Sequence, residues 1–173
     1  MNIPIRRLFA FGLDYLLIAA YLVILAGMSI TVLASTLRSV YTAAWSAELA
    51  GFLLLTMPVV LYFALLESSP AGATLGKRAL GLRVLKLDGQ RLGVGQGLLR
   101  SAVKFLPWEL AHFTIWQLIY GSASHANLPT WAAVSLAVVY VLVAAYLVTL
   151  FVGRTHRTIY DRIAGSRVIV LAR

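Results

Sequence analysis

The sequence is dominated by apolar segments that are too long for the helices of a soluble domain. Residues 15–34 contain no charged side chain, and about twenty residues at a rise of about 1.5 Å each cross the roughly 30 Å of hydrocarbon in a bilayer. Residues 49–66 and 131–152 are similar segments. Only 12% of the chain is charged, whereas a soluble domain has about 25% charged residues. The chain is therefore predicted to be a membrane protein, with a single domain over residues 1–173.

A fourth apolar segment, residues 105–120, is shorter and more polar than the others, so charge has to decide whether it crosses. Three crossings would carry the last group of arginines to the far side of the membrane, against the positive-inside rule. Four crossings leave fourteen of the fifteen Lys and Arg residues in the cytoplasm and only Arg38 outside. We therefore predict a protein of the cell membrane with both termini cytoplasmic. Its four spans are residues 8–34, 49–66, 105–120 and 131–152.

The polar connection between the second and third spans, residues 68–104, contains β-prone sequence. Residues 82–87 have the composition of a strand, and Asp88-Gly89 is a favoured two-residue hairpin turn, after which residues 90–94 would return. Near the C-terminus, residues 167–171 form another β-prone run. Because an isolated hairpin is only marginally stable, we expect this run to pair with it.

The end of the same connection is predicted to be helical. Apolar residues recur at helical spacing over residues 98–106, while Arg100 and Lys104 lie on another face. This pattern is typical of an amphipathic helix that lies on lipid headgroups. The expected fold class is thus an all-α membrane protein with four transmembrane helices, a small cytoplasmic β-hairpin or sheet, and an interfacial amphipathic helix.

Charged side chains at the two ends of the chain form the first candidate site. Arg7 and Asp14 are seven residues apart and lie on one helical face, while Asp161 and Arg162 follow the last span on the same predicted side of the membrane. These four residues are predicted to form one charged cluster. It could be an ion- or proton-linked site, but a carboxylate at a membrane surface more often orients helices through salt bridges, and we favour that interpretation.

Glu109 and His112 form the second candidate site, because residues three apart share a helical face. They could act as a proton relay, as half of a metal site, or as a buried polar pair. A single Glu-x-x-His motif is too little for a di-metal bundle, and the chain has no cysteine for a thiolate site. We favour the polar pair, expect no metal or cofactor, and find no arrangement of catalytic residues that would indicate an enzyme.

Basic residues of the central connection form the third candidate site. The segment from Gly72 to Arg78 resembles a phosphate-binding loop, but its glycine spacing is too short and Arg follows the lysine where Ser or Thr is required. The residues predicted to bind lipid headgroups are Lys77, Arg78, Arg100 and Lys104. The net charge of +9 therefore indicates anionic lipid rather than nucleic acid, since no basic motif with stacking aromatics is present.

Three ordered blocks of sequence resemble the RDD family of small membrane proteins, which is named for one Arg and two Asp. The first block carries Arg7 and Asp14, the second runs from Thr74 to Val84, and the third runs from Arg157 to Val168 and contains Asp161 as the second aspartate. Two positions depart from the family pattern. Tyr160 and Leu75 stand where members often carry His and Pro, which puts any role of an imidazole before Asp161 in doubt.

The resemblance implies a location and a fold more than an activity, with transport the usual suggestion for the family. The first functional expectation is therefore transport of ions or small solutes by an oligomer, because four spans are few for a self-contained pathway. The alternative is a non-catalytic scaffold or accessory subunit. It would bind anionic lipid or a membrane protein partner through its basic cytoplasmic face.

Overall fold

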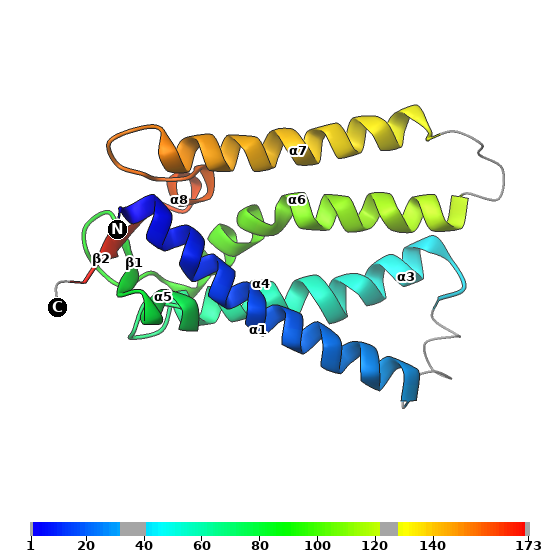
Figure 1. Cartoon of the computed structure of the whole chain (residues 1–173), viewed down its shortest axis with the longest axis horizontal. Helices are drawn as coiled ribbons and strands as arrows, with labels where there is room; N and C mark the ends of the chain where they lie inside the picture. Colours follow the sequence, from blue (N-terminus) through cyan, green and yellow to red (C-terminus); the bar gives the residue numbers. More distant parts are fainter. Residues whose placement is uncertain (1, 32–40, 122–127, 172–173) are drawn as a thin grey trace.

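The computed structural model describes residues 2–31, 41–121 and 128–171, and within them long helices lie side by side along the longest axis of the molecule (Figure 1). The short elements α5, β1, α8 and β2 gather at one end, together with the first turns of α1. We call this the polar end. The elements in chain order are α1 Ile3–Thr31, α3 Ala44–Gly51, a π-helical turn Phe52–Thr56, α4 Met57–Glu67, α5 Leu75–Ala79, β1 Leu82–Lys86, α6 Val94–Gly121, α7 Thr130–Phe151, α8 Ile159–Ile163 and β2 Ser166–Val170.

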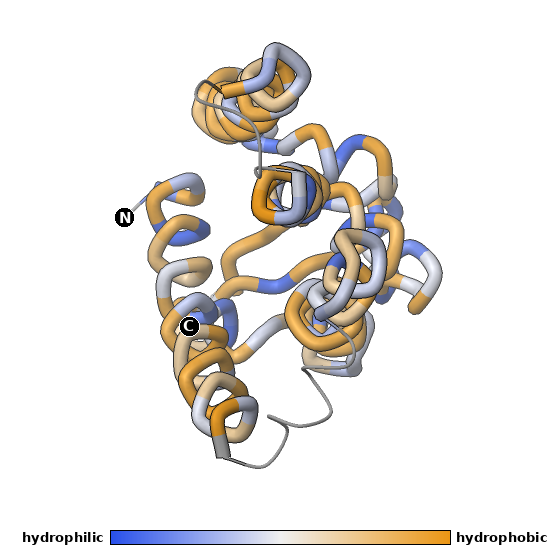
Figure 2. The backbone as a smooth tube through the Cα atoms, turned by 90° about the vertical axis from the view of Figure 1, so that its right-hand side faces the viewer, coloured by the Kyte–Doolittle hydropathy of each residue, from blue (hydrophilic) through white to orange (hydrophobic). Residues whose placement is uncertain are grey.

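Within the described residues, three helical stretches are long and apolar enough to cross a membrane. They are Ile3–Ile30, Ala44–Glu67 and Thr130–Phe151. Their large apolar side chains are widely exposed. Figure 2 shows that most residues along the long helices are hydrophobic. This exposure is expected where the solvent is lipid rather than water. The end of the first predicted span, residues 32–34, and Arg38 lie outside the described residues.

Helix α6 differs from the prediction, which separated an interfacial helix over residues 98–106 from a short span over residues 105–120. The structure joins both into one helix of 28 residues, Val94–Gly121. Charged side chains at Arg100, Lys104 and Glu109 make α6 more polar than the three candidate spans. Neither a fourth crossing nor a separate interfacial helix is therefore confirmed.

Pro107 lies inside α6 without ending the helix, because a tyrosine replaces the hydrogen bond that the proline cannot make. Proline has no N–H, so it cannot donate to the carbonyl of Val103 one turn earlier. The hydroxyl of Tyr146 in α7 donates to that oxygen at 2.5 Å. The lost backbone bond is thus replaced by a side chain, as an apolar environment requires, and the replacement ties α6 to α7.

A second proline whose missing hydrogen bond is replaced by a tyrosine lies in the stretch Ala44–Glu67. Pro58 offers no N–H to the carbonyl of Leu54, and the hydroxyl of Tyr21 in α1 donates to that oxygen at 2.6 Å. The backbone widens into the π-helical turn immediately before Pro58. Here the tyrosine ties α1 to the segment that joins α3 and α4.

The small sheet pairs segments from the centre and the end of the chain. Strand β1 runs antiparallel to β2, from Leu82 opposite Val170 to Lys86 opposite Ser166. The predicted partnership of these two segments is confirmed. The returning strand at residues 90–94 was wrong: only an isolated bridge between Leu85 and Arg91 forms there, because α6 already begins at Val94.

The sheet packs on the first helix and fixes the last segment of the chain against it. Leu82 and Val84 of β1 and Val168 of β2 are buried against Ala10 of α1 and Leu92. A second core, deeper in the bundle, is centred on Phe63. Burying apolar surface stabilises the folded state by about 25 cal/mol per Å². The polar end therefore has a stabilising apolar core of its own.

Candidate functional site

Asp161 is the centre of the polar end, and a local capping motif fixes its position. Thr158 is the N-cap of α8, and the Asp161 N–H donates to its hydroxyl at 3.4 Å. In return, the Thr158 N–H and hydroxyl donate to the Asp161 carboxylate at 3.0 and 2.8 Å. This reciprocal arrangement is a capping box, which satisfies the free donors of a helix start. Both side chains are buried, so the carboxylate is held rigidly.

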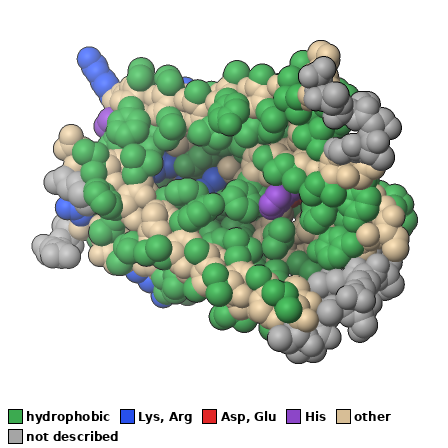
Figure 3. All heavy atoms as spheres, turned by 45° about the vertical axis from the view of Figure 1, so that its right-hand side comes forward, with side chains coloured by type: hydrophobic (Ala, Val, Ile, Leu, Met, Phe, Trp, Pro, Cys, Tyr) green, Lys and Arg blue, Asp and Glu red, His purple; other side chains and the backbone are tan. Residues whose placement is uncertain are grey.

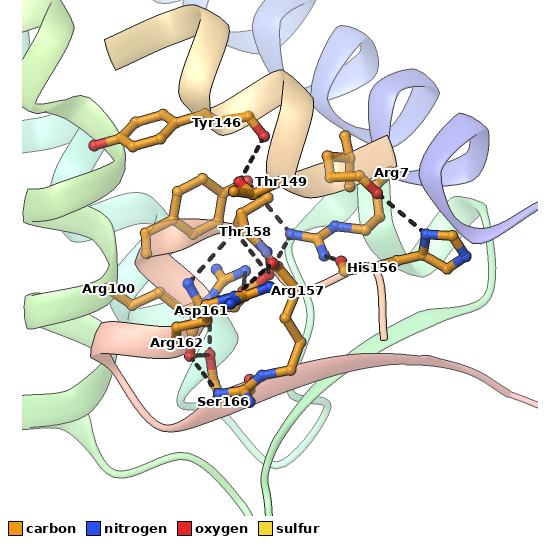
Figure 4. A network of polar contacts seen from close by, with 12 residues as sticks. Arg7, Arg100, Tyr146, Thr149, His156, Arg157, Thr158, Asp161, Arg162 and Ser166 are labelled. Carbon is orange, nitrogen blue, oxygen red and sulfur yellow. Dashed lines mark hydrogen bonds and ion pairs between the residues drawn. The ribbon is translucent and has the colours of Figure 1, made fainter. Parts of the chain in front are cut away.

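Two arginines from distant helices converge on this carboxylate (Figure 4). Arg7 of α1 places Nη2 at 2.7 Å from Oδ2 of Asp161, and its Nη1 donates to the carbonyl of His156. Arg100 of α6 donates from Nε at 3.0 Å and from Nη2 at 2.6 Å to Oδ1. Arg7 is 154 positions and Arg100 is 61 positions away from Asp161 in the chain. The Asp161 side chain thereby joins three distant parts of the sequence.

The contacts continue from Arg100 into a row of alternating charge. Arg100 is ion-paired with Glu67 at the end of α4, and Glu67 accepts from Lys77 Nζ at 2.7 Å. The order Arg7–Asp161–Arg100–Glu67–Lys77 is called the ion-pair chain below. All five side chains are buried, and each comes from a different helix. The ion-pair chain therefore binds α1, α8, α6, α4 and α5 together.

Burial and charge act against each other at Asp161. Burial alone would raise the pKa of its carboxyl, but the charges of Arg100 and Arg7 outweigh it and hold that pKa well below the ordinary value for aspartate. The carboxylate is therefore ionised at neutral pH. Removing one partner of such a buried pair is costly, because a charge would be left without compensation.

Asp14 does not belong to the ion-pair chain, which corrects the predicted cluster. Its carboxylate accepts from the Thr74 hydroxyl at 2.6 Å, the Gly76 N–H at 2.8 Å and the Tyr62 hydroxyl at 2.8 Å. These partners belong to α4 and to the start of α5. Asp14 thus anchors the short helix α5 on α1 through neutral donors.

Gly76 permits this contact because α5 approaches α1 closely. A Cβ at this position would lie 2.1 Å from the carbonyl oxygen of Ala10 and 2.9 Å from the carboxylate of Asp14. Backbone atoms cannot yield at such a distance. The glycine spacing that resembles a phosphate-binding loop is therefore explained by helix packing.

Arg162, the fourth residue of the predicted cluster, also lies apart from the ion-pair chain. Its side chain is exposed and donates to the carbonyl of Arg157 at 3.3 Å. Of the predicted cluster, the structure brings together Arg7 and Asp161. The hypothesis that the two ends of the chain are tied by charge holds for this pair.

The four residues predicted to bind headgroups occupy different environments. Lys77 and Arg100 were expected on the membrane surface, and instead both are buried in ion pairs with Glu67. Arg78 is exposed, although its Nε donates to the carbonyl of Ala73. Lys104 is half-buried inside the bundle.

Glu109 and His112 lie together within the bundle, as their spacing predicts. His112 Nδ1 is 4.0 Å from the Glu109 carboxylate, and the hydroxyl of Thr56 donates to that carboxylate and lies 3.5 Å from the histidine. In the part of the chain that the structure describes, no group of three or more His, Cys, Asp or Glu residues is placed to hold a metal ion. The arrangement forms a small polar group between the π-helical turn and α6.

Sequence reasoning missed Glu67, Thr74 and Thr158. Glu67 ends an apolar segment, and a charge in that position is usually interpreted as the boundary of a span. The two threonines are N-caps of five-residue helices, and the spacing from Thr158 to Asp161 is a signal of a capping box. That spacing could have identified α8 before the structure.

Comparisons with known proteins agree with the sequence blocks described above. The model of the RDD family matches residues 3–165. A stretch of 52 residues is 44% identical to the uncharacterized protein YxaI of Bacillus subtilis (strain 168); it covers 30% of this chain and about a third (34%) of the length of YxaI. No solved structure shows significant similarity to the chain.

Proposed function

The chain belongs to the RDD family, and we propose that it is a non-catalytic membrane scaffold that presents a rigid, basic surface to an acidic partner protein. The observation that carries this proposal is the ion-pair chain. It joins five helices through buried charges of alternating sign. Separating any of these pairs inside the protein would cost about 3–5 kcal/mol, which favours a fixed platform over a moving gate.

Basic side chains outside the ion-pair chain supply the surface for the partner. Asp88 is the exposed acid among the described residues, so these cations are not neutralised by neighbouring carboxylates. Complementary charge accelerates encounter and selects a partner of opposite sign. The exposed cations of this surface are Arg78, Arg91, Arg154, Arg162 and Arg167.

The proposed topology has four spans, with α6 as the additional crossing and both termini in the cytoplasm. Helix α6 is 28 residues long, or about 42 Å at the usual rise, and it runs beside α7 (Figure 1). The basic residues at the polar end favour the cytoplasmic side for that end. A cysteine placed at exposed Arg154 should resist membrane-impermeant reagents in intact cells, and labelling there would overturn the topology.

Transport of ions or small solutes by a homo-oligomer is the second candidate. The observation that favours it is the polar group of Thr56, Glu109 and His112, because ionisable side chains inside a bundle are costly and often mark an ion path. The two candidates differ in a simple measurement. A transporter moves ions across a sealed vesicle, and a scaffold does not.

The test uses proteoliposomes and a charged peptide. The scaffold proposal expects proton and sodium fluxes equal to those of empty liposomes, for the wild type and for Glu109→Gln alike. It also expects a polyglutamate peptide to bind the protein in zwitterionic nanodiscs, and this binding should disappear in the double variant Arg91→Glu, Arg167→Glu. Flux that is present in the wild type and lost in Glu109→Gln would instead establish transport.

A further inference from the structure

A cavity opens on the apolar side of the molecule, next to the ion-pair chain. It has a volume of about 350 Å³, which falls within the usual range of about 300–1,000 Å³ for ligand pockets. Figure 3 shows a hollow in a surface of hydrophobic side chains, with Lys and Arg side chains in its depth. The surrounding surface is the one expected to face lipid.

The walls of the cavity are apolar and follow three helices. The groove extends along α7 from Val139 to Leu150, a length of about 16 Å at the helical rise. This length matches half of the roughly 30 Å hydrocarbon thickness, and hence one leaflet. Six of the wall residues are Leu8 and Phe11 of α1, Phe105 and Trp108 of α6, and Val143 and Leu147 of α7.

The floor of the cavity carries charge of one sign. Arg7, Lys77, Arg100 and Lys104 line it, and none of the acidic residues that the structure describes does. Three of these cations belong to the ion-pair chain, in which they face only two carboxylates. An anion in the cavity would therefore meet an excess of positive charge.

Lys104 is the cation of the cavity floor that forms no direct ion pair among the described residues. Its ammonium instead lies 3.3 Å from the ring centre of Phe63, 4.8 Å from that of Phe11 and 5.0 Å from that of Phe105. Cation–π contacts stabilise the charged form, but they do not supply the negative charge that an anionic ligand in the cavity would bring.

A second unsatisfied group belongs to a residue of the cavity wall. Trp108 lines it, and among the described residues the buried indole N–H has no hydrogen-bond partner. An indole N–H is a donor only. A phosphate or ester oxygen of a bound lipid that reached this N–H would accept its hydrogen bond.

We propose that this cavity binds an anionic phospholipid of the surrounding bilayer. Its phosphate lies against Lys104, and one acyl chain follows the groove between α1, α6 and α7. A small soluble anion would leave the apolar groove empty, whereas a zwitterionic lipid would bring a second cation toward a floor that is already positive. The site differs from the exposed basic surface proposed for a protein partner, and it does not depend on that proposal.

Trp108 provides the measurement, because brominated acyl chains quench tryptophan only on contact. Trp45, Trp116 and Trp131 are replaced by Phe, which leaves one indole on the cavity wall. The protein is then placed in bilayers that contain dibromo-phosphatidylglycerol or dibromo-phosphatidylcholine at equal mole fraction. We expect the anionic lipid to associate about fivefold more strongly, the factor typical of one basic residue near an anionic headgroup.

Three variants in this background separate charge from shape. Lys104→Met should abolish the preference, while the matched control Arg91→Met removes an exposed cation outside the cavity and should keep it. Ala111→Phe fills the groove without changing charge, and it should reduce quenching by both lipids. A circular dichroism spectrum and a monodisperse elution profile establish that each variant is folded.

The outcomes are decisive in either direction. Preference for phosphatidylglycerol that is lost in Lys104→Met and kept in Arg91→Met supports the site. Equal quenching by the two lipids in the parent protein would overturn it. Stronger quenching by dibromostearate than by the anionic phospholipid would overturn the phospholipid assignment, and so would displacement of the lipid by inorganic phosphate alone.

Discussion

Replacing Asp161 by Asn removes the carboxylate on which Arg7 and Arg100 converge. The variant keeps nearly the same volume, so the loss is one of charge. Arg100 still has Glu67, but Arg7 loses the only acid with which it is ion-paired among the described residues. A buried charge without compensation costs about 3–5 kcal/mol, and the weakened capping box adds about 1 kcal/mol. We expect Asp161→Asn to lower the free energy of unfolding by about 4–6 kcal/mol.

The measurement is unfolding by SDS in mixed detergent micelles, followed by circular dichroism. The matched control is Asp88→Asn, which removes an acid from the exposed turn after β1, where an amide can still accept the hydrogen bond from the N–H of Gln90. The control should unfold like the wild type. If Asp161→Asn also unfolds at the wild-type SDS fraction, the ion-pair chain does not hold the polar end together.

Three further predictions concern pH, a proline and a glycine. The pKa of Asp161 is lower in the folded protein than the roughly 3.9 of an unfolded chain. The ionised Asp161 therefore stabilises the folded state above about pH 4, and this stabilisation declines as the pH falls further. Acid unfolding should accordingly be less steep in Asp161→Asn. Tyr146→Phe leaves the Val103 carbonyl without its donor and should cost about 1–3 kcal/mol in SDS unfolding, and an unchanged midpoint would contradict this. Gly76→Ala forces a methyl group against Ala10, so protease cleavage near α5 should accelerate, whereas wild-type cleavage rates would refute the close approach.

The parts of the fold that depend on local pattern could be predicted from the sequence. Long uncharged runs identified three apolar helices, and the alternation and turn residues around Asp88-Gly89 identified β1. The pairing of β1 with β2 followed because a short hairpin needs another strand. The division of α6 failed for a tertiary reason: Arg100 was expected on the headgroups, but Glu67 and Asp161 from other helices pair with it inside the protein.

The candidate site was predicted where charge alone determines the partner. Arg7 and Asp161 carry opposite charges on the same predicted side of the membrane, and they do pair. The partners of Asp14 could not be predicted, because they are neutral donors brought close by the packing of Gly76 on α1. Glu67 was missed because its role depends on Arg100, which α6 brings into the interior.

The coupling between Arg7 and Asp161 tests most directly the claim that charge binds the first helix to the last segment of the chain. A double-mutant cycle of Arg7→Gln, Asp161→Asn and the double variant measures it by SDS unfolding. Since each residue stabilises through the other, the double variant should lose at least about 1 kcal/mol less than the two single losses together. Losses that add to within about 0.5 kcal/mol would contradict the account.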